Sequence, residues 1–150
     1  MACTVYELGT LTDYKYVVII SVYKGMIMLS KHNFRLTWEN QGGHIEEGET
    51  PLDAAKRELY EESGAVEFTI EPIFDYRSGD DKNYADGQVF LAHVTKLEPI
   101  PESSEMRDVG FSEFIPRALT YPEITRTLMQ KAKSMGLIDY KTTPSKKPNK

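Results

Sequence analysis

The chain has 150 residues, of which 40% are hydrophobic and 27% are charged, which excludes an extensively disordered protein. Its single cysteine, Cys3, cannot form an internal disulfide, which excludes a disulfide-stabilised secreted scaffold and favours the cytoplasm. The longest apolar run, residues 17–20, is too short to span a membrane. With 14 basic and 23 acidic side chains, residues 1–140 carry a net charge of −9, which argues against a nucleic-acid clamp.

The first part of the chain is predicted to hold an arm, a hairpin and a loop. Residues 1–14 are expected to form a variable arm. Strands are predicted over 16–22 and 26–30, which are rich in Val, Ile, Tyr and Met. The polar segment 31–41 predicts a loop, and the glycine pair 42–43 indicates a sharp turn or a close approach of two backbones.

A helix is predicted over Pro51–Ser63, because its start and stop signals are both present. Thr50 suits the N-cap, Pro51 suits the first helical position, and Gly64 suits the position after the last turn. The predicted apolar stripe consists of Leu52, Ala55 and Leu59.

Strand-like and polar segments alternate in the second half. Strands are predicted over 66–76, 88–94 and 109–111. Polar loops are predicted over 77–87 and 96–107. Thr120, Pro122 and Glu123 indicate the start of a second helix that ends near Met135, with Gly136 as its cap. The apolar stripe of this helix is predicted to be Ile124, Leu128 and Ala132.

This order of elements predicts an α/β fold in which a mixed β-sheet is covered by helices. One domain is expected over residues 1–140. The last ten residues, 141–150, hold four Lys and no acidic residue, and they are expected to form a disordered tail.

Residues 46–62 concentrate charge, with seven acidic side chains and two basic ones. At about 100° per residue, Glu58, Glu61 and Glu62 lie together on one shoulder of the predicted helix. Like charges at this spacing repel one another, and partial burial would raise the pKa of each carboxyl group. A divalent cation would reverse this repulsion, and a ligand set made only of oxygen favours Mg²⁺ or Mn²⁺ over zinc. The residues alone therefore indicate metal-assisted phosphate chemistry.

The same segment resembles the signature of the Nudix hydrolase family, and of its MutT-like members in particular. The matching positions are Gly43, Glu49, Arg57, Glu58, Leu59, Glu61, Glu62 and Gly64. Two positions depart from the family pattern. Ala65 is small where an apolar residue is typical, and Gln41 stands where many members have proline. The order of elements agrees with the family over about residues 15–138.

The resemblance implies a mixed β-sheet sandwiched between helices. It also implies an enzyme that hydrolyses a nucleoside diphosphate linked to another group, by attack of water on phosphorus. The family pattern makes Glu58, Glu61 and Glu62 the expected metal ligands, helped by the carbonyl of Gly43.

Other roles follow from the resemblance in the same way. Glu49 is expected to support the helix or a second cation, and Arg57 is expected to orient and partly neutralise the carboxylates. The general base that takes the proton from water is expected to be Glu58, with Glu105 as the second choice. An acid from a late loop joins the site in some relatives, and Glu105 fits this position better than Glu102.

Three residues are predicted to bind the substrate. Trp38 is the candidate for stacking on a base, and Arg35 is the candidate for contacting the base or the phosphates. His44 lies inside the signature loop, where a phosphate is expected.

The compact length favours a MutT-like nucleoside triphosphate pyrophosphohydrolase that uses Mg²⁺ or Mn²⁺ and acts on oxidised nucleotides such as 8-oxo-dGTP. Two alternatives stay open: a nucleotide-sensing module without catalysis, and an RNA 5′-end pyrophosphohydrolase. The expected partner is a small nucleotide rather than a nucleic acid or a membrane. A monomer or a homodimer in the cytoplasm is expected.

Overall fold

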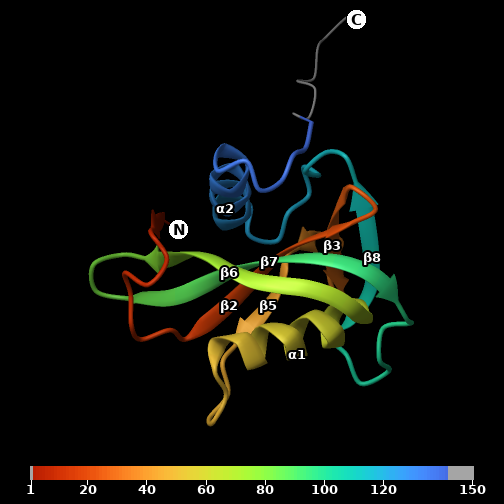
Figure 1. Cartoon of the computed structure of the whole chain (residues 1–150), viewed down its shortest axis with the longest axis horizontal. Coiled ribbons are helices and arrows are strands. Elements are labelled where there is room, and N and C mark those ends of the chain that lie inside the picture. Colours follow the sequence, from red (N-terminus) through yellow and green to blue (C-terminus); the bar gives the residue numbers. More distant parts are fainter. Residues whose placement is uncertain (1, 142–150) are drawn as a thin grey trace, which may run out of the picture.

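The computed structural model describes residues 2–141. Within this range an eight-stranded mixed sheet lies between α1 (Pro51–Ser63) on one face and α2 (Pro122–Ser134) on the other (Figure 1). The strands are β1 (Cys3–Tyr6), β2 (Tyr16–Tyr23), β3 (Met26–His32), β4 (Trp38–Glu39), β5 (Gln41–His44), β6 (Ala65–Gly79), β7 (Tyr84–Leu97) and β8 (Met106–Ser112). This arrangement confirms the predicted α/β fold with a mixed sheet sandwiched between helices.

Strand β2 lies inside the sheet and determines where β5 is placed. Along one edge it pairs in parallel with β7, from Tyr16 opposite Gly87 to Tyr23 opposite Val94. Its other edge is shared, because β5 pairs with the first half of β2 and β3 pairs with its end. All the other pairs are antiparallel. The order of strands across the sheet is β1-β6-β7-β2-β3-β4, with β5 beside β2 and β8 beside β3. The shared edge places β5 against α1.

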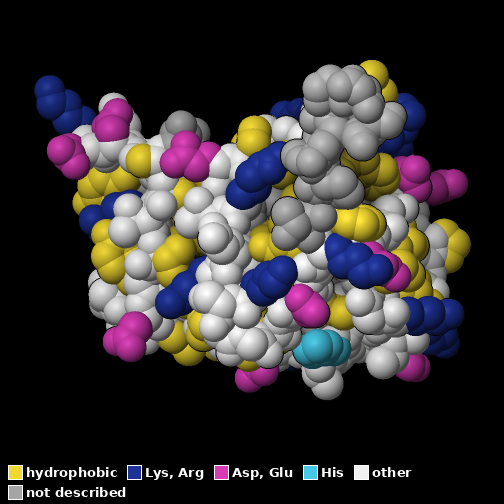
Figure 2. Space-filling model, turned by 90° about the horizontal axis from the view of Figure 1, so that it is seen from above, with side chains coloured by type: hydrophobic (Ala, Val, Ile, Leu, Met, Phe, Trp, Pro, Cys, Tyr) yellow, Lys and Arg dark blue, Asp and Glu magenta, His cyan; other side chains and the backbone are white. Residues whose placement is uncertain are grey.

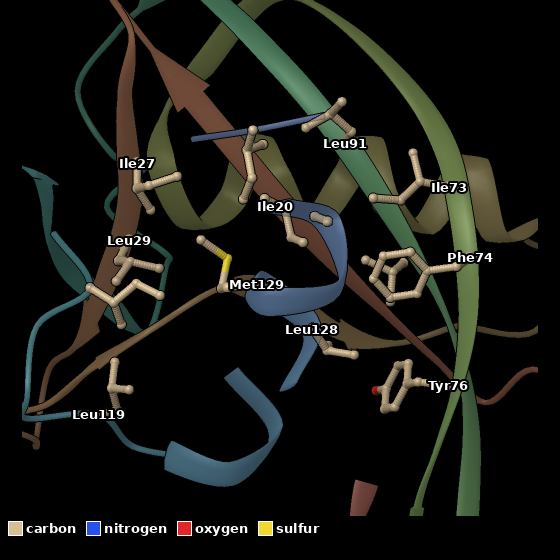
Figure 3. Packing of buried hydrophobic residues seen from close by; sticks show 14 residues of the cluster. Ile20, Ile27, Leu29, Ile73, Phe74, Tyr76, Leu91, Leu119, Leu128 and Met129 are labelled. Carbon is tan, nitrogen blue, oxygen red and sulfur yellow. The ribbon is translucent and has the colours of Figure 1, made fainter. Parts of the chain in front are cut away.

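Different residues are buried on the two faces of the sheet. On one face α1 contributes the small side chains Ala54 and Ala55 together with Leu59. On the other face Leu128 and Met129 of α2 pack against the sheet (Figure 3). Because helix-to-sheet distance depends on the side chains at the contact, the alanines let α1 lie close to the strands. The glutamates of α1 are thereby brought near β5.

Local signals fix the ends of α1 where the sequence predicts them. The Thr50 hydroxyl accepts a hydrogen bond from the Asp53 N–H, and the Asp53 carboxylate accepts one from the Thr50 N–H, each at 3.1 Å. Gly64 ends the helix with φ 81°, in the left-handed region. One member of the predicted stripe is wrong, because Leu52 is 37% exposed. The buried face runs instead through Ala54, Ala55, Leu59 and Ser63.

The second helix is also confirmed, with Gly136 in a left-handed conformation just beyond it. No helix within residues 2–141 has the length and apolar character needed to cross a membrane. The tail predicted over 141–150 lies outside the described residues except for Lys141. The N–H of Lys141 donates to the carbonyl of Glu113, and its ammonium lies 2.7 Å from the Glu113 carboxylate.

Three segments predicted as loops are partly strands. The segment 77–87 belongs to a long hairpin, because β6 and β7 both extend into it. Its polar side chains pair across the strands, as Arg77 does with Asp86 at 2.6 Å. In the segment 31–41, β3 continues for two residues and β4 pairs with it. The segment 96–107 is likewise shortened at both ends, by β7 and β8.

The N-terminal arm and the glycine pair also differ from expectation. Within the predicted arm, β1 pairs with β6, and the Asp75 carboxylate accepts hydrogen bonds at 2.9 Å from the Leu11 N–H and the Tyr14 hydroxyl. The glycine pair 42–43 lies in β5 rather than in a turn. The close approach is confirmed, since a Cβ at Gly42 would collide with the carbonyl oxygen of Val17.

We expect Gly64→Ala to destabilise the fold more than Gly136→Ala does. Both glycines have positive φ, so each substitution costs about 1–2 kcal/mol of backbone strain. Only at Gly64 would the new Cβ also collide with a neighbour, the carbonyl oxygen of Glu98, whereas nothing lies within 4 Å of a Cβ at Gly136. Urea unfolding followed by circular dichroism measures the difference. Equal losses for the two variants would contradict the packing described here.

Candidate active site

A cleft of about 820 Å³ lies where β5, the second half of α1, residues 103–106 and the start of α2 meet. Its charged lining is strongly acidic. The acidic side chains are Glu39, Glu46, Glu58, Glu61, Glu62 and Glu105. The basic side chains are Arg35 and Arg57, with His32 and His44 beside them. The excess of carboxylates means that a cationic ligand is favoured there.

Arg57 is the centre of the ionic network on α1. Its guanidinium donates to both carboxylate oxygens of Glu49, at 2.6 and 2.9 Å. Nη1 also donates to Glu58 at 3.1 Å and to Glu61 at 3.3 Å, and Nη2 donates to the carbonyl of His44 at 3.1 Å. One side chain therefore joins the loop before the helix to the carboxylates on the helix.

Glu49 is held apart from the other carboxylates. Hydrogen bonds from Arg57 lower its pKa to about 2, and the Glu46 N–H donates to the same carboxylate. Glu49 does not line the cleft, whereas Glu58, Glu61 and Glu62 do. Its position supports the predicted role in bracing the helix.

Glu58 and Glu62 lie deepest in the site. Burial raises the pKa of Glu62 to about 9, and burial also raises the pKa of Glu58. The two carboxyl groups are hydrogen-bonded to each other, and the N–H of Gly42 donates to Glu62 at 2.9 Å. Gly43 is essential beside them, because a Cβ there would collide with the Glu58 carboxylate.

The chemistry of these donors fits a hard divalent cation. The groups are all carboxylate oxygens, and two of them, on Glu58 and Glu62, are partly buried where a negative charge is costly unless a positive charge is near. In the described part of the chain, no three Asp, Glu, His or Cys side chains lie in positions from which they could hold an ion without rearranging. Glu58 instead faces Glu62 and Arg57, and the side chain of Glu61 is 48% exposed.

The candidate substrate residues are only partly brought together. Arg35 lines the cleft and lies 3.3 Å from Glu39, and His44 lines it with its ring 4.3 Å from that of Tyr16. Trp38 does not line the cleft. Its ring packs beneath the Lys31 ammonium at 4.5 Å and fills the space beside Gly110.

Among the late-loop acids, Glu105 lines the cleft and Glu102 does not. The Glu105 carboxylate is 85% exposed and lies 3.5 Å from Nε2 of His32. It therefore stands at the rim, away from the buried pair.

Two lining residues had no signal in the sequence. Glu39 is only 8% exposed, although it precedes the signature by a few residues in a segment predicted as a loop. Tyr121 precedes α2 and interacts with Arg35 through a hydrogen bond. The side of β4 on which Glu39 lies, and the position of Tyr121 just before α2, become clear only once the fold is known.

Comparison with known proteins gives a consistent result. The family model described as NUDIX domain matches residues 14–132. An oxidized purine nucleoside triphosphate hydrolase from Mus musculus is 32% identical over 130 residues, which cover 82% of this chain and 83% of that protein. An RNA pyrophosphohydrolase from Psychrobacter sp. (strain PRwf-1) is 43% identical over 47 residues, 31% of this chain and 27% of that protein. The Bacillus subtilis pyrophosphohydrolase BsRppH has a similar fold, with a TM-score of 0.73, 21% identity and coverage of 91% of this chain and 93% of that one.

We expect Glu62→Gln to change how stability depends on pH. With a chelator present, the folded chain keeps a proton on Glu62 up to about pH 9, whereas the unfolded chain loses it near 4.5. The free energy of unfolding of the wild type should therefore fall as pH rises between these values. The non-titrating amide of Glu62→Gln should remove this part of the fall.

Urea unfolding at a series of pH values measures the effect. Glu47→Gln is the matched control, because Glu47 is an exposed glutamate of the preceding loop. Parallel curves for the wild type and Glu62→Gln would show that Glu62 is not buried in its protonated form.

Proposed function

Because this chain belongs to the Nudix family of pyrophosphohydrolases, we propose that it hydrolyses nucleoside triphosphates to the monophosphate and pyrophosphate. The observation that carries the proposal is the acidic cleft, which is lined by Glu58, Glu61 and Glu62 and in which Arg57 pairs with Glu58 and Glu61. Such a cleft repels a polyphosphate unless a cation is bound first. The cleft therefore suits a substrate that arrives with metal.

Nudix hydrolases use divalent metal ions, and we assign Mg²⁺ or Mn²⁺ to this chain. Glu58, Glu61 and Glu62 would hold the cation, with the carbonyl of Gly43 as a further ligand. Bound there, the ion neutralises phosphate charge and lowers the pKa of a coordinated water. The all-oxygen donor set supports these two ions over zinc.

Glu58 is the proposed general base. Its carboxyl group lines the cleft beside the other proposed ligands, and without a cation its burial raises its pKa. The 3.1 Å contact with Nη1 of Arg57 keeps one of its oxygens oriented. Glu105 is the second candidate, because it lines the same cleft from the rim.

The nucleoside is proposed to lie between β4 and the start of α2. Tyr121 is 46% exposed at the cleft and offers an aromatic face, while Arg35 and Glu39 offer a donor and an acceptor. His44 is proposed to contact a phosphate, since its loop is joined to Arg57. Trp38 supports this wall from behind rather than stacking on the base.

A purine nucleotide damaged by oxidation, such as 8-oxo-dGTP, is the proposed substrate. The support is the similarity to the Mus musculus oxidized purine nucleoside triphosphate hydrolase, which extends over most of both chains. We further propose that the domain spans residues 1–140 and acts in the cytoplasm as a monomer or homodimer.

Removal of an RNA 5′-pyrophosphate is the second candidate function. It is favoured by similarity to RNA pyrophosphohydrolases from Psychrobacter sp. (strain PRwf-1) and Bartonella bacilliformis (strain ATCC 35685 / KC583 / Herrer 020/F12,63), the latter 67% identical over 27 residues, 18% of this chain and 16% of that protein. The net charge of −9 over residues 1–140 opposes it, because RNA binding gains affinity from basic surface. Figure 2 shows Lys and Arg scattered among acidic and apolar side chains on the face it displays.

We expect Glu58→Gln to lower kcat by about 10²–10⁴-fold, the usual contribution of a general base. Turnover of a panel of nucleotides with Mg²⁺ or Mn²⁺, with products identified in ¹⁸O-labelled water, gives the substrate and the attacked phosphorus together. Glu47→Gln should retain activity, because this exposed residue lies outside the cleft. A folded wild type that is inactive on the whole panel with either metal would overturn the proposed function.

We expect kcat/KM for 8-oxo-dGTP to exceed that for a 5′-triphosphorylated RNA oligonucleotide at both low and physiological salt. Turnover of 8-oxo-dGTP should not fall steeply as salt rises, because a single nucleotide lacks the many backbone phosphates from which a polymer releases counterions on binding. A preference for the RNA that weakens steeply with salt would favour the second candidate instead.

A further inference from the structure

A continuous chain of buried hydrogen bonds crosses three strands beneath α1. It consists of Ser21 on β2, Gln41 on β5 and Ser30 on β3, and none of the three has any exposed surface. The Ser21 hydroxyl lies 2.6 Å from Oε1 of Gln41, and Nε2 of Gln41 lies 2.9 Å from the Ser30 hydroxyl. This series of hydrogen bonds ends on α1, where the Ser30 hydroxyl donates to the carbonyl of Glu62 at 2.8 Å.

Each hydrogen bond in this series is donated toward α1, from Ser21 to Gln41, from Gln41 to Ser30 and from Ser30 to Glu62. The single hydroxyl proton of Ser30 is used on the Glu62 carbonyl, so Ser30 must accept from Gln41. The amide nitrogen of Gln41 can donate only if its oxygen faces Ser21, which is the arrangement present. Ser21 and Gln41 also donate to the carbonyl of Met28, at 3.1 and 3.4 Å. A carboxylate, a proline or an alkyl group at position 41 would remove the donor to Ser30.

Glu62 is consequently held at both ends. Ser30 fixes its backbone carbonyl, and the N–H of Gly42 fixes its carboxylate at 2.9 Å. Gly42 follows Gln41 directly in β5, so the same buried amide anchors the strand that supplies this N–H. Gln41, the position at which the sequence departs from the common proline, therefore contacts Ser30 and precedes Gly42, the two residues that restrain Glu62.

We propose that Gln41 and Ser30 are positioning residues that set the metal affinity of the glutamates on α1, by fixing the backbone and the carboxylate of Glu62. The inference rests on the proposed function, because it takes Glu62 to be a metal ligand. Groups that orient metal ligands typically change metal affinity by about 10–100-fold when removed. Neither side chain has exposed surface, so both are proposed to act through Glu62.

The test compares Ser30→Ala with Ser21→Ala. Each variant removes one fully buried hydroxyl from the same network, so their losses of stability should be similar. Only Ser30→Ala removes the link to Glu62, because Ser21→Ala leaves the bonds from Gln41 to Ser30 and from Ser30 to Glu62 in place. Ser30→Thr keeps the hydroxyl and serves as the conservative variant.

Two readouts are measured on the full chain. Mn²⁺ binding, followed by electron paramagnetic resonance, should weaken by about 10–100-fold in Ser30→Ala and stay near the wild-type value in Ser21→Ala and Ser30→Thr. Hydrogen exchange of the Gly42 amide, followed by NMR without metal, should accelerate in Ser30→Ala more than in Ser21→Ala. Gln41→Glu should behave like Ser30→Ala if it folds, and the serine variants decide the question if it does not.

The outcomes separate the two proposals. A wild-type chain that takes up Mn²⁺ while Ser30→Ala and Ser21→Ala bind it equally would overturn this inference alone. Equal exchange of the Gly42 amide in those two variants would overturn it as well. A wild-type chain that takes up no Mn²⁺ would overturn the proposed function, and this inference with it.

Discussion

The ion pair between Arg57 and Glu49 is the interaction on which the arrangement of the site depends. It is bidentate, and a planar guanidinium that holds a carboxylate through two hydrogen bonds has little freedom to rotate. The remaining nitrogen of Arg57 can then face Glu58 and Glu61 only in the direction that this pair allows. A lysine could not replace it, because a single ammonium would lose the fork that joins loop and helix.

The packing of α1 imposes a desolvation cost on Glu58 and Glu62 that the ion pairs of Arg57 do not remove. Ala54 and Ala55 bring the helix close to the sheet, and Glu58 and Glu62 are partly buried as a result. Burying carboxyl groups favours their neutral forms, so the fold stores an unfavourable interaction at this place. An incoming cation would relieve it. The same closeness requires glycine at position 43, where no side chain fits beside Glu58.

The sequence predicts best what is determined locally. The ends of α1 follow from Thr50 and Gly64, whose contacts lie within one helical turn. The hairpin over 77–87 was not predictable from composition, because Arg77 and its neighbours satisfy their polarity across the strands and resemble loop residues. The places of Glu39 and Trp38 depend on contacts with distant segments. Trp38, which composition makes a candidate for stacking, has its backbone N–H and carbonyl engaged by residues 118 and 120.

One edge of the sheet ends in a very short strand, β1, and this protects a long hairpin from self-association. The outer side of β6 would otherwise present a row of unpaired backbone groups, which is a template for joining another copy edge to edge. Four residues, Cys3–Tyr6, cover part of that row, while the seven-residue β8 beside β3 forms the other edge of the sheet. The N-terminal segment is thus a guard against aggregation as well as a part of the sheet.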